Sequence, residues 1–239
     1  MSRFIPRDRR GHRYPPESFS ASGPWDLGST TSAALISRWR ADSVSTSGAS
    51  VTGMADIGGG GRHQTSDGAD PTLNVSDAGY NNRPTVVGSV SRLKGTAGAL
   101  ISAPVSLLVV GQAAATTALL SAGDESPYNL VWKSSLNVEF YALAVTKASN
   151  VPGTKTYLLI TDDGSAAPDA CKMYVGDFTT PAATGVTCWG PVNTLSVGMT
   201  SAGVQNLSGK FADSGVWSGV LSLADRVKVE QYVKNRYGA

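Results

Sequence analysis

Short apolar segments separated by turn residues dominate the chain after about residue 33. Segment 34–41 alternates from Leu35 onward with the two-residue period of a half-buried strand, and Ile36 is the exception. Further β-like runs lie at 83–90, 99–111, 118–121, 129–132, 137–145, 156–161 and 172–175. Many short strands with turn signals between them predict an antiparallel sandwich or barrel rather than alternating βαβ units.

Two regions of this body depart from the strand pattern. Residues 43–70 are small and polar and include the run Gly58 to Gly61, so they predict a long loop with a flexible glycine connection. The C-terminus predicts one helix over 222–236, because Ser222 is placed to cap it and Asp225 completes a capping-box arrangement. Basic residues in its last turn suit the helix dipole.

Residues 1–32 predict an extended basic arm in front of a body that spans 33–239. Five arginines and one aspartate stand in the first 13 residues, although the net charge of the whole chain is only +2. Large apolar side chains are spaced among these arginines. Such side chains are unfavourable in a segment that stays in water, so they indicate a segment that packs against another surface. A solvated disordered tail is the alternative, but we expect the arm to bind a protein partner. Its predicted contact residues are Arg3, Phe4, Ile5, Arg7, Arg9, Arg10, Arg13, Tyr14 and Trp25.

Composition bears on whether the chain enters a membrane, is secreted or forms disulfides. The longest apolar runs fall well short of the roughly 18 residues of a membrane span, and no apolar stretch follows the basic N-terminus, so we expect neither membrane insertion nor a secretory signal. Cys171 and Cys188 could pair across neighbouring strands, but without a signal free buried thiols are the expectation.

Four segments together resemble laminin-G-like domains of the concanavalin A-like superfamily. The first three, at 35–43, 54–64 and 82–86, resemble the opening of such a domain, and segment 215–238 resembles its last strand and terminal helix. Met54-Ala55-Asp56 stands where family members usually carry a Trp before an Asp-x-Ser-Gly turn, and Gly58 replaces the serine of that turn. The resemblance implies an all-β fold, an antiparallel jelly-roll sandwich. Because this scaffold hosts sugar binding, hydrolysis and adhesion alike, function depends on individual residues.

Catalysis finds little support in the residues. A glycosidase needs two carboxylates that flank the scissile bond, but the chain has only four glutamates and no Glu-x-Asp-x-Glu strand. Glu139 is the one plausible carboxylate, but strand alternation favours an outward-facing polar residue at this position. No Gly-x-Ser-x-Gly elbow is present, and no Lys-Ser or Lys-Thr follows the glycine run as in a phosphate loop. We therefore expect a protein that is not an enzyme and carries no cofactor.

Candidate ligand residues are aromatics and amides for sugars, and aspartates for calcium. Exposed aromatics can stack on sugar rings while neighbouring amides bind hydroxyls, although most aromatics of a sandwich of this size lie in the core or at its rim. The possible glycan-binding residues are Tyr80, Asn81, Asn82, Tyr128, Trp132 and Trp189. We predict no metal site; the weaker candidates for calcium are Asp162, Asp163 and Asp177, which also suit hairpin turns.

Two functions remain. The first is a structural virion protein of a tailed bacteriophage, a head-decoration or tail-associated subunit. It would be assembled in the host cytoplasm in many copies or as a homo-oligomer, and its arm would bind a major capsid or tail protein. The alternative is a carbohydrate-binding or adhesion module that recognises a bacterial surface glycan.

Overall fold

The computed structural model describes residues 27, 31–113, 117–122, 129–133, 137–141, 145–149, 154–187, 189–197 and 207–238, and between 117 and 149 it describes the backbone. The first strands in chain order are β1 (Ala34–Arg40), β2 (Val44–Ser47), β3 (Ser50–Met54), β4 (Gln64–Ser66), β5 (Thr72–Asp77), β6 (Arg83–Ser91), β7 (Leu93–Gly95) and β8 (Val105–Ala113). The next are β9 (Thr117–Ala122), β10 (Asn129–Lys133), β11 (Asn137–Tyr141), β12 (Val145–Ser149), β13 (Thr156–Asp162), β14 (Cys171–Val175), β15 (Ala183–Gly185), β16 (Leu195–Val197) and β17 (Leu207–Ser218). A 3₁₀ turn, η1, covers Ala78–Tyr80, and the helix α2 covers Leu223–Tyr237.

The strands pair antiparallel in two layers, which confirms the predicted all-β sandwich. In one layer β17 pairs with β8 on one side and with β1 and β6 on the other, and β13, β14 and β15 continue from β8. The second layer runs from β2 through β3, β4, β7, β16, β9, β10 and β11 to β12. Strand β5 pairs with both β6 and β3 and so joins the layers.

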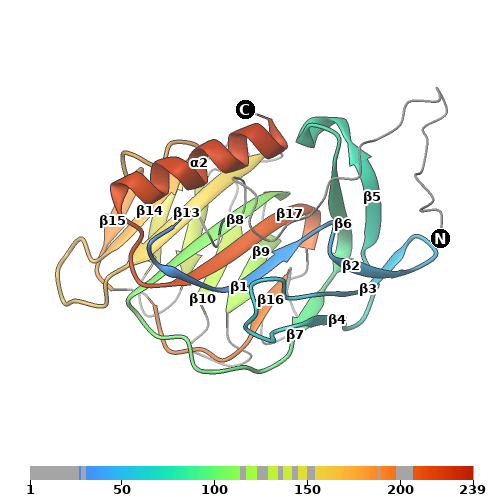
Figure 1. The fold of residues 1–239 in the computed structure, drawn as a ribbon, viewed down its shortest axis with the longest axis horizontal. Coiled ribbons are helices and arrows are strands. Elements are labelled where there is room, and N and C mark those ends of the chain that lie inside the picture. The colour runs from blue at the N-terminus through green and yellow to red at the C-terminus, as the bar shows by residue number, and fades with distance from the viewer. Residues whose placement is uncertain are drawn as a thin grey trace, which may run out of the picture.

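Both faces of the central layer are buried. Along β8, Leu107 and Val109 belong to a core that includes side chains from both layers, whereas Leu108 and Val110 belong to a second core on the opposite face. This alternation follows from the two-residue period of a strand. Helix α2 covers the second face and lies over β13, β14 and β15 (Figure 1).

The C-terminal helix begins as the sequence predicts. The Ser222 hydroxyl accepts a hydrogen bond from the Asp225 N–H at 3.2 Å and donates to the Asp225 carboxylate at 2.9 Å. The same carboxylate accepts bonds from the N–H and the hydroxyl of Ser32, at 3.2 and 2.6 Å, so it also holds the start of the body. No helix among the described residues is long and apolar enough to span a membrane.

A buried ion pair fastens this helix to the sheet. Asp213 on β17 is 0% exposed, and its carboxylate accepts two bonds from the Arg38 guanidinium of β1, at 3.0 and 3.3 Å. The hydroxyls of Tyr232 and Tyr237 on α2 donate to the same carboxylate at 3.0 and 2.9 Å. One carboxylate therefore joins two strands and the helix.

The surroundings of Asp213 also change the acidity of these groups. Burial alone would lower the pKa of Arg38, but the Asp213 charge raises it above its ordinary value. Burial, with help from the same charge, raises the pKa of Tyr232 to about 12 and that of Tyr237 well above its ordinary value. Burial also raises the pKa of Tyr157 to about 12. The helix-covered core thus favours neutral tyrosines.

Packing of the body extends into the segment that the sequence assigns to the arm. Leu27 is fully buried in the core beneath α2. The Thr31 hydroxyl donates to the Leu27 carbonyl at 3.1 Å and accepts from the Trp217 indole N–H at 3.0 Å. The indoles of Trp39 and Trp217 are buried. The predicted contact residues of the arm, from Arg3 to Trp25, lie outside the described part of the chain.

Several boundaries differ from the sequence prediction. The predicted loop at 43–70 contains β2, β3 and β4, because serine and threonine residues without an apolar alternation still pair with neighbouring strands. The strand predicted from residue 99 begins only at Val105, and residues 99–102 form one wall of a pocket instead. The run predicted at 137–145 is divided between β11 and β12.

Asp213→Ala tests the buried ion pair. The substitution leaves Arg38 buried without its counter-charge, so we expect the free energy of unfolding to fall by about 3–5 kcal/mol. Urea unfolding followed by tryptophan fluorescence measures the change. Asp169→Ala is the control: it removes an exposed ion pair with Lys172 and should change stability by less than about 1 kcal/mol. Equal effects of the two substitutions would contradict the role of Asp213.

The tyrosine pKa values predict a loss of stability in alkali. A group whose pKa is higher in the folded state contributes its full stability below the unfolded pKa of 10.0 and loses it as the pH rises through the folded value. We expect the free energy of unfolding to fall above pH 10.0 and, for Tyr232 alone, by roughly 2 kcal/mol as the pH passes about 12. Tyr232→Phe should make this slope shallower in urea titrations at each pH. An unchanged slope would contradict the assignment.

Candidate functional site

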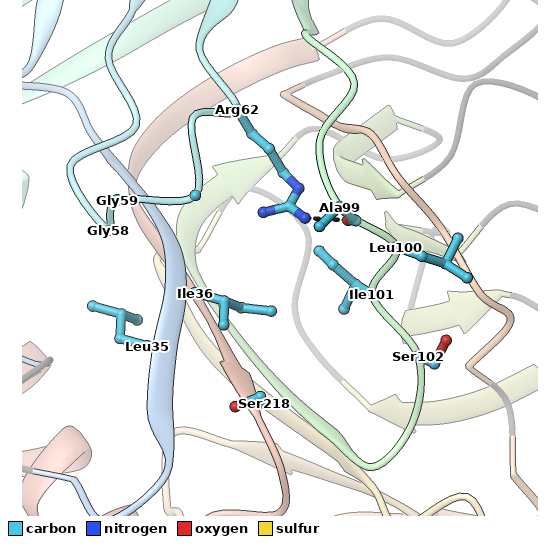
Figure 2. A pocket seen from close by; sticks show the side chains of 11 residues that line it. Leu35, Ile36, Gly58, Gly59, Arg62, Ala99, Leu100, Ile101, Ser102 and Ser218 are labelled. Carbon is cyan, nitrogen blue, oxygen red and sulfur yellow. Dashed lines mark hydrogen bonds between the residues drawn. The ribbon is translucent and has the colours of Figure 1, made fainter.

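A pocket opens beside strand β1, at the edge of the central layer. Its volume is about 580 Å³, and its walls come from β1, the glycine run, the segment before β8 and the end of β17. We call it the Arg62 pocket, and its lining residues are Leu35, Ile36, Gly58, Gly59, Gly60, Arg62, Ala99, Leu100, Ile101, Ser102 and Ser218. Figure 2 shows the Arg62 side chain reaching across it toward Ala99, with Ile36 and Ile101 pointing toward each other beneath the guanidinium.

The Asp56 carboxylate organises the loop that forms one wall. One oxygen accepts the N–H groups of Arg38 and Gly58, both at 2.9 Å, and the other accepts the N–H of Arg62 at 3.0 Å. A carboxylate that accepts several backbone N–H groups fixes their positions relative to one another. The chain therefore closes around Asp56, and residues 57–61 bulge toward the pocket.

Two glycines of this loop are required by close packing. A Cβ on Gly58 would lie 2.6 Å from the backbone nitrogen of Arg38, and one on Gly60 would lie 2.1 Å from the carbonyl oxygen of Ile36. Both distances are below any real Cβ contact, so only glycine fits at these positions. The sequence prediction of a flexible connection is wrong here, because β1 packs against the run and Asp56 holds its ends. The same contact explains why Gly58 stands where the resembled turn has a serine.

Arg62 is buried within the pocket wall. Its side chain is 3% exposed, and it donates from Nη1 to the Ser37 hydroxyl at 2.9 Å and from Nη2 to the Ala99 carbonyl. Its own carbonyl accepts the indole N–H of Trp39 at 2.7 Å. Burial lowers the pKa of the guanidinium, with the Asp56 charge acting in the opposite direction. Ser37 and Trp39, which share one face of β1, thus hold Arg62 at both ends.

Tyr80 and Trp189, the two predicted glycan-binding aromatics whose side chains the structure describes, do not form an exposed platform. Tyr80 is 1% exposed and packs edge-on against Tyr237, with ring centroids 6.4 Å apart. Trp189 is 4% exposed, and its indole N–H donates to the Ile101 carbonyl at 3.3 Å. Both predictions are wrong, because each ring fills a core. Tyr128 and the side chain of Trp132 lie outside the described part of the chain.

The two predicted amides lie apart from the pocket. Asn81 and Asn82 are exposed and adopt left-handed backbone angles, with φ of 54° and 57°. The Asn81 side chain donates to the Asn235 carbonyl at 3.3 Å, near the end of α2. The amides therefore form a turn beside the helix, and the structure does not bring them to the Arg62 pocket.

The three candidate calcium ligands do not come together either. The Asp162 carboxylate is occupied by donors from Gly164, Thr187 and Trp189 at 2.8, 2.9 and 2.8 Å. Asp163 and Asp177 accept backbone N–H groups within their own turns. Since Asp162 pairs with Cys171 and Asp177 follows Val175, β14 separates them by at least roughly 13 Å. Among the described residues no cluster of potential metal ligands forms.

The expectation of free thiols is wrong. Cys171, at the start of β14, is buried and disulfide-bonded. The other cysteine of the chain, Cys188, lies outside the described residues. Disulfides persist in oxidising surroundings.

Sequence reasoning did not identify Arg62 as a candidate. Its signal is a carboxylate two residues before a four-glycine run and an arginine directly after it. That spacing alone does not reveal which strand the glycines approach, so the pocket depends on the tertiary packing against β1.

No protein-family model matches the chain, and no curated protein matches it. Among solved structures, domain 4 of AbnA, an extracellular arabinanase from Geobacillus stearothermophilus solved in complex with arabinotriose, is similar with a TM-score of 0.60 and 12% identity, over 83% of this chain and 99% of that one. The receptor-binding domain of botulinum neurotoxin type G is similar with a TM-score of 0.57 and 10% identity, over 82% of this chain and 51% of that one. A sialidase from Trypanosoma rangeli is similar with a TM-score of 0.54 and 11% identity, over 84% of this chain and 32% of that one.

These similarities show the fold, a lectin-like β-sandwich. The chain spans about half of the neurotoxin domain and a third of the sialidase, so it corresponds to one part of those larger chains. The comparisons give no support to a bacteriophage virion, capsid or tail role. That role depended mainly on arm residues outside the described part of the chain, and it stays a prediction.

Asp56→Asn tests the support of the loop. The amide would present N–H groups to the Arg62 backbone N–H, so we expect the free energy of unfolding to fall by about 1–3 kcal/mol. Asp163→Asn is the matched control, because Asp163 also accepts a backbone N–H but lies in an exposed turn, and its effect should stay within about 0.5 kcal/mol. Chemical unfolding of both variants measures the difference. No loss of stability in Asp56→Asn would contradict the role of the carboxylate.

Proposed function

We propose that this protein is a non-catalytic module that binds a glycan through the Arg62 pocket. The observation that carries the proposal is the pocket itself, which combines hydroxyls of Ser102 and Ser218 with backbone groups of the glycine run and an apolar wall. Sugar recognition needs this mixture, since ring C–H groups contact apolar side chains and hydroxyls pair with polar groups.

The described lining residues favour binding over cleavage. None of them is an Asp, Glu or His, whereas glycoside hydrolysis uses a pair of carboxylates across the scissile bond. Asp56, the nearest carboxylate in the loop, is occupied by three backbone N–H groups. The wall therefore supplies hydrogen-bonding groups without a free acid or base.

Two further observations support an external glycan as the ligand. The sandwich is similar over most of its length to a domain of an extracellular arabinanase that was solved with arabinotriose. The disulfide at Cys171 suits a protein that works in oxidising surroundings outside the cytosol. Presentation on a virion would be compatible with the same binding role.

Blocking the pocket tests the proposal. Ser102 is exposed at the pocket, so Ser102→Trp should fill its mouth and weaken glycan binding at least about ten-fold, a difference of about 1.4 kcal/mol. Ser47→Trp, on the exposed strand β2, is the matched control and should bind as the wild type does. A glycan array probed with the full-length protein identifies the ligand, with arabinotriose included, and calorimetry gives the affinities.

Three outcomes of this experiment would overturn the proposal. Absence of binding to every glycan on the array would remove the function. Equal affinities of Ser102→Trp and the wild type would place binding outside the Arg62 pocket. Release of new reducing ends from the bound glycan would show that the module is catalytic.

A further inference from the structure

Arg62 is a buried cation without a carboxylate partner. Its two side-chain hydrogen bonds go to neutral acceptors, the Ser37 hydroxyl and the Ala99 carbonyl, and its Nε–H has no partner among the described residues. A guanidinium has five N–H groups, so two of the five are engaged. Removing a charged group from water is costly unless an opposite charge compensates it.

Three other buried or half-buried arginines in the described structure have such a charge, whereas the half-buried Arg226 donates to the carbonyls of Phe178 and Leu221. Arg38 pairs with Asp213 at 3.0 Å, Arg236 pairs with Asp42 at 2.6 Å, and Arg92 pairs with Asp67 at 3.4 Å. Asp56 lies near Arg62, but its two oxygens accept the backbone N–H groups of the loop rather than the guanidinium. Arg62 differs from these arginines in lining a pocket.

Backbone donors add to the positive character of the site. The N–H groups of Gly59 and Gly60, which line the pocket, make no hydrogen bond with any described residue. Successive backbone N–H groups in a loop of glycines with φ of 90° and 69° at Gly59 and Gly61 form a concavity that suits an anion. The described lining residues include no negative side chain.

We infer that the Arg62 pocket selects a sugar that bears a carboxylate, a uronic or other acidic sugar, and that Arg62 binds that carboxylate. The inference rests on the proposed glycan-binding function and names the ligand class. A guanidinium presents paired N–H groups that match the two oxygens of a carboxylate, and the bond gains strength in a site screened from water. The apolar side chains of Ile36 and Ile101, which lie on the same side of β1, are placed for the C–H face of the sugar ring (Figure 2).

The size of the pocket agrees with this ligand class. A cavity of about 580 Å³ lies within the range of roughly 300–1,000 Å³ that holds small ligands. Leu100 at its rim is 66% exposed and extends the apolar surface toward solvent. One acidic sugar residue can therefore occupy the pocket while the rest of a chain continues over the rim.

The decisive comparison uses the wild-type protein and one change in the ligand. Trigalacturonate and its methyl ester share the same rings and hydroxyls but differ in charge. We expect the acid to bind about 10- to 100-fold more tightly than the ester in calorimetry at low salt, because only the acid forms charge-assisted bonds. Added salt should weaken the binding of the acid more than the binding of the ester.

Substitutions then assign the preference to Arg62. Arg62→Met should abolish the difference between acid and ester, and Arg62→Lys should keep part of it, because the charge remains but the paired donors are lost. Arg92→Met is the control, since its ion pair with Asp67 does not line the pocket, and it should keep the full preference. Near-ultraviolet circular dichroism checks the fold of each variant. If Arg62→Met does not fold, the acid–ester comparison on the wild type still decides the ligand class, and Arg62→Lys decides the residue.

Each contrary outcome overturns a stated part. Equal binding of acid and ester, or binding of neutral sugars only, would refute the acidic ligand and leave the proposed function in place. Equal affinity for a sulfated trisaccharide would refute the choice of a carboxylate. If Arg62→Met and Arg62→Lys both kept the full preference for the acid over the ester, Arg62 would not be the residue that binds the carboxylate. Failure of all glycans, with binding of a peptide through its free carboxyl end, would refute the proposed function together with the inference.

Discussion

The buried carboxylate of Asp213 is the interaction on which the arrangement of this protein depends. It lies on β17, the long strand that pairs with β1, β6 and β8, and it receives hydrogen bonds from β1 and from two tyrosines of α2. Because Arg38 neutralises it, the charge can lie beneath a helix. Without this pair α2 would keep its apolar packing but lose the hydrogen bonds that join its two tyrosines to β17.

The same residue of β1 also connects the helix to the pocket. The Arg38 side chain reaches Asp213, while its backbone N–H donates to Asp56, which holds the glycine loop. The neighbouring side chains of Ser37 and Trp39 point to the other face, where they bond the guanidinium and the carbonyl of Arg62. Alternation along a single strand therefore places an ion pair on one face and a pocket on the other.

The sequence predicts those features that depend on local patterns. The cap at Ser222 and Asp225 needs only neighbours along the chain, and β13 and β14 show in short apolar runs bounded by turns. Whether Tyr80 and Trp189 are buried depends instead on which elements pack over them. No local sequence pattern predicts that α2 covers the second face of the central layer. The requirement for glycine at Gly58 and Gly60 likewise arises from the approach of β1, which is distant in sequence.

An unpaired buried arginine needs a physical reason to persist. A structural role would be met by a neutral side chain, because Ser37 and Ala99 offer neutral acceptors and Ile36 and Ile101 offer apolar contacts. Replacement of a buried charge by a well-packed apolar group is often neutral or stabilising. On this principle we expect an apolar residue in place of Arg62 to cost the protein little stability, so the proposed binding of an acidic sugar gives the guanidinium a reason to persist. In the proposed complex, the carboxylate of the sugar would supply an opposite charge, and the buried guanidinium would contribute to affinity and selectivity.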